Sequence, residues 1–268
     1  MCGKSAPGLI ADGSAATGVT IKTAGELERM REAGRIVALA VRRMLDALEP
    51  GITTRELDSI ARRQIETMGG KPAFLGYLGF PATVCISLND EIVHGIPGRR
   101  VVQDGDVVSL DCGAVVGGMY SDHAVTAIAG SASPEKRALI DVTTEALKAA
   151  IGAVRPDNRI GDVSNAIETH VLPRGYQLVR EYVGHGIGRS LHEPPSVPNF
   201  GQAGRGPKLR PGMVLAVEPM VNIGGWETKV LDDGWTVVTA DGSLSAHFEH
   251  TIAVTGEGPE VLTTLPGA

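Results

Sequence analysis

Cysteine is scarce in this chain, and its spacing forms no recognisable framework. Three cysteines occur among 268 residues, at positions 2, 85 and 112. An odd number of cysteines without a Cys-x-x-Cys spacing excludes a disulfide scaffold and a thiolate zinc site, and it is typical of a reducing compartment. We therefore expect a cytoplasmic protein whose fold depends on a hydrophobic core.

Long apolar runs and an excess of positive charge are also missing. No segment approaches the roughly 20 apolar residues that span a bilayer, and residues 1–18 lack the apolar stretch of a signal peptide. The net charge of −6 argues against a nucleic-acid site and against membrane binding. Residues 1–22, which are rich in Gly, Ala and Ser, are predicted to be a flexible tail that precedes a single domain over residues 23–268.

Hydrophobic periodicity predicts the same order of elements twice along the chain. Helices are predicted over residues 23–48, 54–68, 134–154 and 160–172. Strands are predicted over residues 83–87, 107–116 and 119–129 in the first half, and over 178–182, 213–217, 236–238 and 247–254 in the second. The predicted fold class is therefore α+β, with two helix–helix–strand halves related by a pseudo-twofold axis.

The two halves can be aligned residue by residue. Pro50 aligns with Pro156 at an offset of 106 residues, and the strand ending at Asp111 aligns with the one ending at Glu218 at an offset of 107. Chance similarity between two amphipathic units is the alternative explanation. If the halves are equivalent, a site at the seam between them draws its ligands from both.

Four acidic residues lie in apolar, β-branched runs where a carboxylate is unusual: Asp111, Asp122, Glu218 and Glu249. Each one alone is more often ion-paired or solvated, but a buried carboxylate must be paired or must hold a metal. His185, which is framed by glycines, lies between the two pairs in the sequence. Four carboxylates and one imidazole form a ligand set for two divalent cations, because two such ions neutralise the four negative charges. A water shared by two ions is deprotonated near neutral pH, which favours a hydrolase.

The geometry of this set depends on a predicted β-hairpin. Gly117-Gly118 is a two-residue turn signal between two alternating runs. With this turn, Gly113 pairs with Asp122 and Asp111 pairs with Ala124. The two aspartates then share one face of the sheet, about 7–8 Å apart at the backbone, which suits two carboxylates that converge on metal ions.

Strand parity also separates the histidines into two groups. His247 and Glu249 share one face, whereas His123 points away from Asp122 and is predicted to be an ordinary packed or surface residue. His94 and His192 lie in segments punctuated by Gly and Pro. They are candidates for hydrogen bonds to a substrate carbonyl or for proton transfer, and the alternative is that they are solvated loop residues.

At the level of motifs, the chain resembles the type I methionine aminopeptidases of metallopeptidase family M24. The matching motifs lie at residues 89–97, 109–113, 121–122, 184–189, 192–195, 216–220 and 245–251. The resemblance covers about residues 23–262 and implies the pita-bread (creatinase/aminopeptidase) fold. It also implies metal-dependent removal of the initiator methionine from nascent polypeptides through a hydroxide that bridges two Co, Mn, Fe or Zn ions, with a small second residue favoured.

Roles for individual residues follow from the same resemblance. It implies that Asp111 binds one metal, that Asp122 and Glu249 bridge both, and that His185 and Glu218 complete the second site. Glu218 is also implied in proton transfer. Two histidines are implied to stabilise the tetrahedral intermediate and to bind the substrate backbone: His94 and His192. The resemblance implies that the methionine pocket is lined by five mostly apolar residues: Tyr77, Phe80, Cys85, Leu191 and Trp235. Strand parity adds His247 as a neighbour that lines the same pocket and contributes to substrate binding.

Two of the pocket positions depart from many members of the family. Phe74 and Leu78 differ from their usual residues, and Phe74 resembles actinobacterial members. Nascent polypeptide N-termini are the expected partners, the ribosome is a candidate partner, and a monomer is expected. One alternative is a prolidase-like X-Pro peptidase, which usually carries an additional N-terminal domain. The other is a non-catalytic peptide-binding module, which tends to lose metal ligands.

Overall fold

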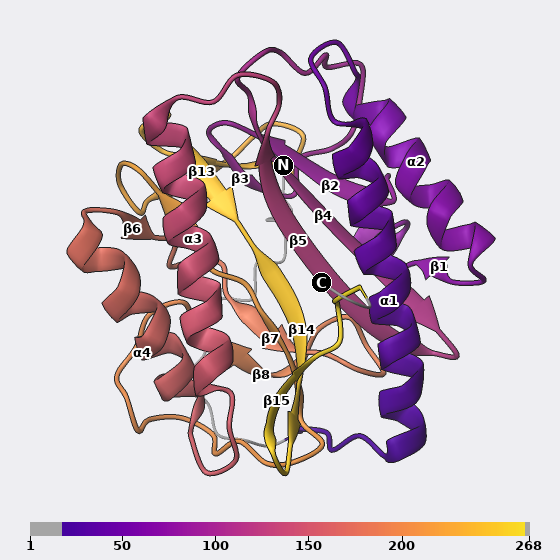
Figure 1. Cartoon of the computed structure of the whole chain (residues 1–268), viewed down its shortest axis with the longest axis vertical. Helices are drawn as coiled ribbons and strands as arrows, with labels where there is room; N and C mark the ends of the chain where they lie inside the picture. Colours follow the sequence, from indigo (N-terminus) through magenta and orange to yellow (C-terminus); the bar gives the residue numbers. More distant parts are fainter. Residues whose placement is uncertain (1–17, 266–268) are drawn as a thin grey trace, which may run out of the picture.

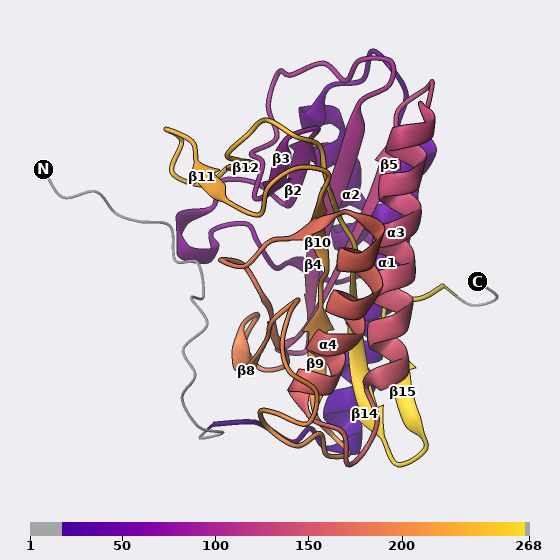
Figure 2. The same cartoon turned by 90° about the vertical axis from the view of Figure 1, so that its left-hand side faces the viewer.

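The computed structural model describes residues 18–265. It places helices and strands in separate layers, as the predicted α+β class requires (Figure 1). Figure 2 shows helices α1 and α3 on one side of the central sheet and the hairpin of β11 and β12 on the other. None of the helices among the described residues combines the length and the apolar composition that a bilayer crossing requires.

Four α-helices form where the hydrophobic periodicity predicts them. They are α1 (Ala24–Ala47), α2 (Thr54–Thr67), α3 (Pro134–Ala153) and α4 (Ile160–Val171). Thr23 and Thr53 each cap a helix N-terminus through a capping box with Glu26 and Glu56, and Ser133 caps α3. These caps satisfy backbone N–H groups that the first helical turn leaves unpaired. The predicted helix boundaries are confirmed to within one or two residues. Two short 3₁₀ turns, η1 (Tyr77–Gly79) and η2 (Leu172–Arg174), complete the helical elements of the described chain.

A nine-stranded sheet crosses both halves of the chain. Its strands are β1 (Lys71–Pro72), β2 (Val84–Leu88), β4 (Val107–Val116), β5 (Met119–Ile128), β7 (Gly184–Gly186), β8 (Glu193–Val197), β9 (Val214–Val217), β14 (Glu249–Thr255) and β15 (Gly258–Val261). The main path runs β1-β4-β5-β14-β9-β7-β8, with β2 paired to β4 and β15 paired to β14.

Two smaller sheets of three strands flank the large one. The first contains β6 (Gln177–Leu178), β10 (Met220–Asn222) and β13 (Ser245–His247), and the second contains β3 (Glu91–Val93), β11 (Thr228–Val230) and β12 (Val237–Thr239). The predicted strand over residues 178–182 is therefore too long, and the predicted strand over residues 247–254 is broken at Phe248 into β13 and β14. A break here lets the chain leave one sheet and join another.

The pseudo-twofold axis passes between β5 and β14. These strands pair antiparallel, with His123 opposite His250, and the two imidazole rings stack with their centroids 4.6 Å apart. Asp122 and Glu249 each precede one member of this pair, so they occupy equivalent positions. The relation between Asp111 and Glu218 seen in the sequence has the same origin, because β4 and β9 lie outside β5 and β14 in the sheet. The predicted pita-bread fold is confirmed.

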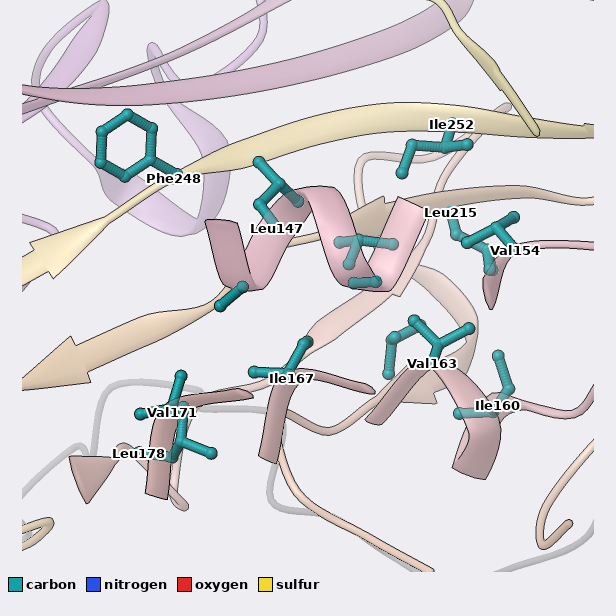
Figure 3. Packing of buried hydrophobic residues seen from close by; sticks show 14 of the residues in the cluster. Leu147, Val154, Ile160, Val163, Ile167, Val171, Leu178, Leu215, Phe248 and Ile252 are labelled. Atoms are coloured by element: carbon teal, nitrogen blue, oxygen red, sulfur yellow. The ribbon is translucent and has the colours of Figure 1, made fainter. Parts of the chain in front are cut away.

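Each half has its own core between its helices and the shared sheet. In the second half, Leu147 of α3 and Ile167 of α4 pack with Leu215 and Ile252 of the sheet (Figure 3). The first half repeats this arrangement with residues of α1, α2, β2 and β4. Full burial of a Leu or Ile side chain contributes about 1.5–3 kcal/mol. The sheet is therefore held from one side, which keeps the strands that carry the candidate site in a fixed register.

The described end of the predicted tail is packed onto the domain. Residues 1–17 lie outside the described part of the chain, but the Lys22 side chain is buried against Glu193. A long-range ion pair, which the local composition does not reveal, therefore holds Lys22 at the end of the predicted tail.

Candidate active site

A cavity of about 350 Å³ lies over the middle of the large sheet. Every site residue predicted from the sequence lines this cavity: Tyr77, Phe80, Cys85, His94, Asp111, Asp122, His185, Leu191, His192, Glu218, Trp235, His247 and Glu249. These residues come from strands and loops of both halves, as expected for a site at the seam. The structure thus brings the whole predicted set together.

The β4–β5 hairpin has the predicted register. Gly113 faces Asp122 and Asp111 faces Ala124, so the two aspartates lie on the same face of the sheet. Gly113 has a further role, because a Cβ atom at this position would lie 2.8 Å from the Phe74 ring. Glycine therefore lets Phe74 pack directly over the strand that carries Asp111.

Three potential metal ligands converge from three different strands. One ligand atom each of Asp122, His185 and Glu249 lies within 4.8 Å of the other two. His185 donates from Nδ1 to the Gly186 carbonyl oxygen at 2.8 Å, which leaves its Nε2 lone pair free for a metal. The flanking glycines have a steric origin: a Cβ at Gly184 would lie 2.4 Å from the Ala216 carbonyl oxygen. They allow close strand pairing around His185, and the alternative of a phosphate loop is not needed to explain them.

The carboxylates are buried together without enough positive charge to balance them. Burial raises the pKa of Asp111 to about 7, and burial together with mutual repulsion raises the pKa values of Asp122 and Glu249 well above their usual range. Among the described residues, Asp111 Oδ1 and Glu249 Oε1 have no hydrogen-bond partner. Buried carboxylate oxygens of this kind are compensated by bound cations, so the residues present fit a divalent metal site.

Glu218 lies between two imidazoles. Its Oε1 is 3.7 Å from His185 Nε2, and its Oε2 is 3.5 Å from His247 Nε2. The His247 side chain is buried, and neither of its ring nitrogens has a hydrogen-bond partner in the described part of the chain. Asn199 holds the backbone at this point, because its Nδ2 donates to the Glu218 carbonyl oxygen at 3.0 Å.

The other two predicted catalytic histidines border the cavity and are neutral at pH 7. Burial lowers the pKa of His94 to about 4, and desolvation also lowers the pKa of His192, which stands at the exposed mouth. The Tyr77 hydroxyl lies 2.7 Å from His192 Nδ1. When this hydroxyl donates, the neutral ring carries its proton on Nε2 and can offer it to a ligand.

The remaining wall is apolar and aromatic. Phe80 and Trp235 meet edge to face with ring centroids 5.1 Å apart, and Cys85 is buried opposite Asp111 in the sheet register. Phe74 and Leu191 are also buried in this cluster. A slot of this composition suits a flexible, polarisable thioether side chain.

Three lining residues were not predicted from the sequence: Val93, Tyr182 and Val183. Val93 directly precedes His94 within the motif at residues 89–97, and Tyr182 and Val183 come just before the motif that begins at Gly184. Position beside a motif residue was therefore the available signal. Tyr182 lies edge-on to His94, with ring centroids 5.7 Å apart. Leu78 also lines the cavity and is 62% exposed at its mouth.

His123 lies away from the cavity, as strand parity predicts. Its side chain is buried, and its Nδ1 lies 2.6 Å from the Glu249 carbonyl oxygen. Together with the stacked ring of His250, it packs on the side of the sheet opposite the carboxylates. It is therefore a packed residue of the seam and contributes no ligand to the cavity.

The sequence and the structure of the chain are both similar to those of known metallopeptidases. Residues 28–256 match metallopeptidase family M24. A methionine aminopeptidase from Clostridium perfringens is 50% identical over 247 residues, which are 92% of this chain and 99% of that protein. The crystal structure of methionine aminopeptidase from Thermotoga maritima has a TM-score of 0.91 at 46% identity and covers 92% of this chain and 99% of that one.

A more distant similarity concerns the fold alone. The prolidase from Pyrococcus furiosus has a TM-score of 0.74 at 24% identity. The similarity covers 91% of this chain and 65% of the prolidase chain. The same arrangement of helices and strands therefore occurs in proteins that are named for different activities.

Proposed function

The chain belongs to metallopeptidase family M24, and we propose that it acts as a methionine aminopeptidase, a metal-dependent hydrolase that removes N-terminal methionine. The observation that carries this proposal is the position of the carboxylate and imidazole cluster at the base of an apolar, aromatic cavity. The cluster suits hydrolysis of a peptide bond, and the slot beside it suits a methionine side chain. High identity to methionine aminopeptidases over nearly the whole chain supports the same activity.

The metal site is proposed to hold two divalent ions of Co, Mn, Fe or Zn. Asp111, Asp122, His185, Glu218 and Glu249 would hold these ions. Two bound divalent ions would lower the pKa of water and so supply a hydroxide nucleophile near neutral pH. The orphaned oxygens of Asp111 and Glu249 support this assignment, because they need a cation or a proton as partner.

The remaining groups of the chain orient the substrate and move protons. Neutral His94 and His192 can donate hydrogen bonds to the substrate carbonyl as negative charge develops on its oxygen. Glu218 would accept and return a proton, and burial, which raises its pKa above the usual value of a glutamate, favours this role. Tyr77 sets the tautomer of His192.

Selectivity is proposed to come from the shape of the cavity. The aromatic pair Phe80 and Trp235, with Cys85, Leu191 and Phe74, would enclose the methionine side chain. The second residue of the substrate would lie beside the carboxylate cluster, where a bulky side chain has little room. We therefore expect Met-Ala and Met-Ser peptides to be preferred.

Nascent polypeptide N-termini in the cytoplasm are the proposed substrates. We also propose that the protein acts as a monomer and that the ribosome is a candidate partner, since initiator methionine first becomes accessible on chains that are still being synthesised. Sucrose-gradient co-sedimentation with ribosomes tests the second point, and light scattering tests the first.

A peptide panel separates this function from its two alternatives. We expect cleavage of Met-Ala-Ser and much slower cleavage of Leu-Ala-Ser and Leu-Pro-Ala, because the first residue must be methionine. Preference for Leu-Pro-Ala over Met-Ala-Ser would instead support a prolidase-like peptidase. Tight peptide binding without stoichiometric metal and without turnover would support a non-catalytic module.

A further inference from the structure

Residues 18–26 precede the match to family M24, which begins at residue 28. Among them, Thr20, Lys22 and Glu26 contact the segment that carries His192. That segment, the 188–193 loop, comprises residues 188–192 between β7 and β8 together with Glu193, the first residue of β8. It contains two cavity-lining residues, Leu191 and His192.

A buried ion pair joins the two segments. Lys22 Nζ donates to Glu193 Oε2 at 2.9 Å and to Thr20 Oγ1 at 2.6 Å. The Lys22 and Glu193 side chains are 1% and 7% exposed. The Thr20 hydroxyl also donates to Glu193 Oε2. Surface ion pairs contribute little to structure, but one from which water is excluded fixes its partners firmly.

The second oxygen of Glu193 holds the loop itself. Glu193 Oε1 accepts hydrogen bonds from the backbone N–H groups of Arg189 at 2.6 Å and Ser190 at 3.1 Å. One carboxylate therefore connects residues 20–22 to the beginning of the loop. Because His192 directly precedes Glu193, the position of this carboxylate determines where the imidazole stands.

Two further contacts fasten the same loop. The Arg189 side chain pairs with Glu26 of α1 at 2.7 Å, and Glu26 is already fixed by its capping box with Thr23. Gly188 leaves space for the Lys22 stem, since a Cβ at this position would lie 2.2 Å from Lys22 Cε. The loop and residues 20–26 are thus fitted to each other at several independent points.

We propose that Lys22 is a positioning residue: through Glu193 it fixes the 188–193 loop, so that His192 and Leu191 meet the substrate in the catalytic geometry. The inference rests on the proposed function for its kinetic consequence, but its structural consequence is independent of that function. Lys22 neither lines the cavity nor belongs to the carboxylate cluster, so it acts on the site indirectly, through its contacts with Glu193 and Gly188.

Lys22→Met removes the charge and retains most of the apolar stem. Arg31→Met is the matched control, because Arg31 also makes a two-point ion pair from the α1 region, at 2.6 and 2.9 Å, but with Glu260 of β15. Limited trypsin digestion followed by mass spectrometry measures cleavage after Arg189 in the folded proteins. We expect about tenfold faster cleavage in Lys22→Met than in the wild type and in the control, since loss of about 1.4 kcal/mol raises the open population tenfold.

The kinetic readout uses Met-Ala-Ser with Mn²⁺. Lys22→Met should lower kcat about tenfold or more, because a small misplacement of a catalytic group is costly. Its affinity for Mn²⁺ in calorimetry should stay within about twofold of wild type, since the metal ligands are not moved. Thr20→Val, a milder change that removes one hydrogen bond to Glu193, should give a smaller effect in the same direction, and it keeps the test available if Lys22→Met does not fold.

A rescue variant distinguishes positioning from general destabilisation. In Lys22→Met/Glu193→Gln the amide oxygen can still accept from the Arg189 and Ser190 N–H groups, and no charge is buried alone. This double variant should cleave more slowly after Arg189 than Lys22→Met and should recover part of kcat. Wild-type rates of trypsin cleavage and of turnover in Lys22→Met, or no recovery of either rate in the double variant, would overturn the proposal. Altered cleavage after Arg189 in a protein whose wild type has no aminopeptidase activity would uphold the positioning and reject the proposed function.

Discussion

At the scale of single residues, the site contains a carboxylate, Glu218, that lies close to two imidazole rings without a positive charge that neutralises it. Glu218 has one oxygen toward His185 and the other toward His247. The His247 contact of 3.5 Å is longer than an ordinary N–H···O hydrogen bond, and the ring has no other partner among the described residues. Outer partners of this kind orient metal ligands, so we expect His247 to orient Glu218 in the proposed metal site.

His247→Leu should therefore weaken metal binding without unfolding the protein. Loss of an outer-shell partner costs about 10–100-fold in metal affinity, and the change should be visible in Mn²⁺ calorimetry. His247→Gln is the matched variant, because its amide can still donate to Glu218 and should retain most of the affinity. Equal affinity in His247→Leu and the wild type would show that His247 does not orient Glu218.

At the scale of elements, the strands that carry the site are held by positions where only glycine fits. A Cβ at Gly186 of β7 would lie 2.3 Å from the Pro194 carbonyl oxygen of β8, a backbone atom that cannot move aside without separating the strands. His185 precedes this glycine and depends on the same pairing. The position of His185, a proposed metal ligand, is thus coupled to the packing of β7 against β8. Both strands are too short to be predicted from periodicity.

Gly186→Ala should destabilise the protein and weaken its metal site. Overpacking of this kind typically costs about 1–3 kcal/mol, which urea denaturation of the metal-free protein can measure. The control is Gly152→Ala in α3, where a Cβ meets no atom within 4 Å. It should stabilise the protein by about 0.5–1 kcal/mol, because alanine is the better helix former. If Gly186→Ala has the stability and the Mn²⁺ affinity of the wild type, close contact between the strands is not the reason for glycine at position 186.

Sequence reasoning succeeds for elements with strong local signals and fails where long-range contacts decide. The four helices and the β4–β5 hairpin follow from caps, periodicity and the Gly117-Gly118 turn, and the register then places Asp111 and Asp122. The buried position of Lys22 and the role of Asn199 depend on partners far away in the chain. The roles of the catalytic histidines came from motif resemblance, since parity alone left them undecided.

At the scale of the whole molecule, the seam between the two halves stores electrostatic repulsion when no metal balances it. Asp122 and Glu249 occupy equivalent positions beside the axis, with Asp111 and Glu218 outside them. Their raised pKa values mean that the metal-free fold binds protons that the unfolded chain has already released. The carboxylates therefore contribute stability at low pH that is lost as the pH rises through their folded pKa values.

This sign predicts that the chelator-treated protein becomes less stable as the pH rises from about 6.5 to 8. Asp111, with a pKa of about 7, loses most of its proton in this range, whereas the buried His94 of the folded protein is neutral throughout it. Thermal denaturation at several pH values measures the slope, and Asp122→Asn should make it shallower by removing one of the repelling charges. With Mn²⁺ present the trend should weaken or reverse. A metal-free protein whose melting temperature rises over this range would contradict the electrostatic account of the seam.

The central claim is that one cavity both binds the metals and selects methionine, and the most direct test is turnover of Met-Ala-Ser by chelator-stripped protein while Mn²⁺ is titrated back. The account predicts no turnover without metal, activity that rises with Mn²⁺ occupancy measured by calorimetry, and a loss of more than about 100-fold in Asp122→Asn, which removes a ligand rather than an outer partner. Undiminished turnover in the presence of excess chelator, or in Asp122→Asn without bound metal, would contradict it.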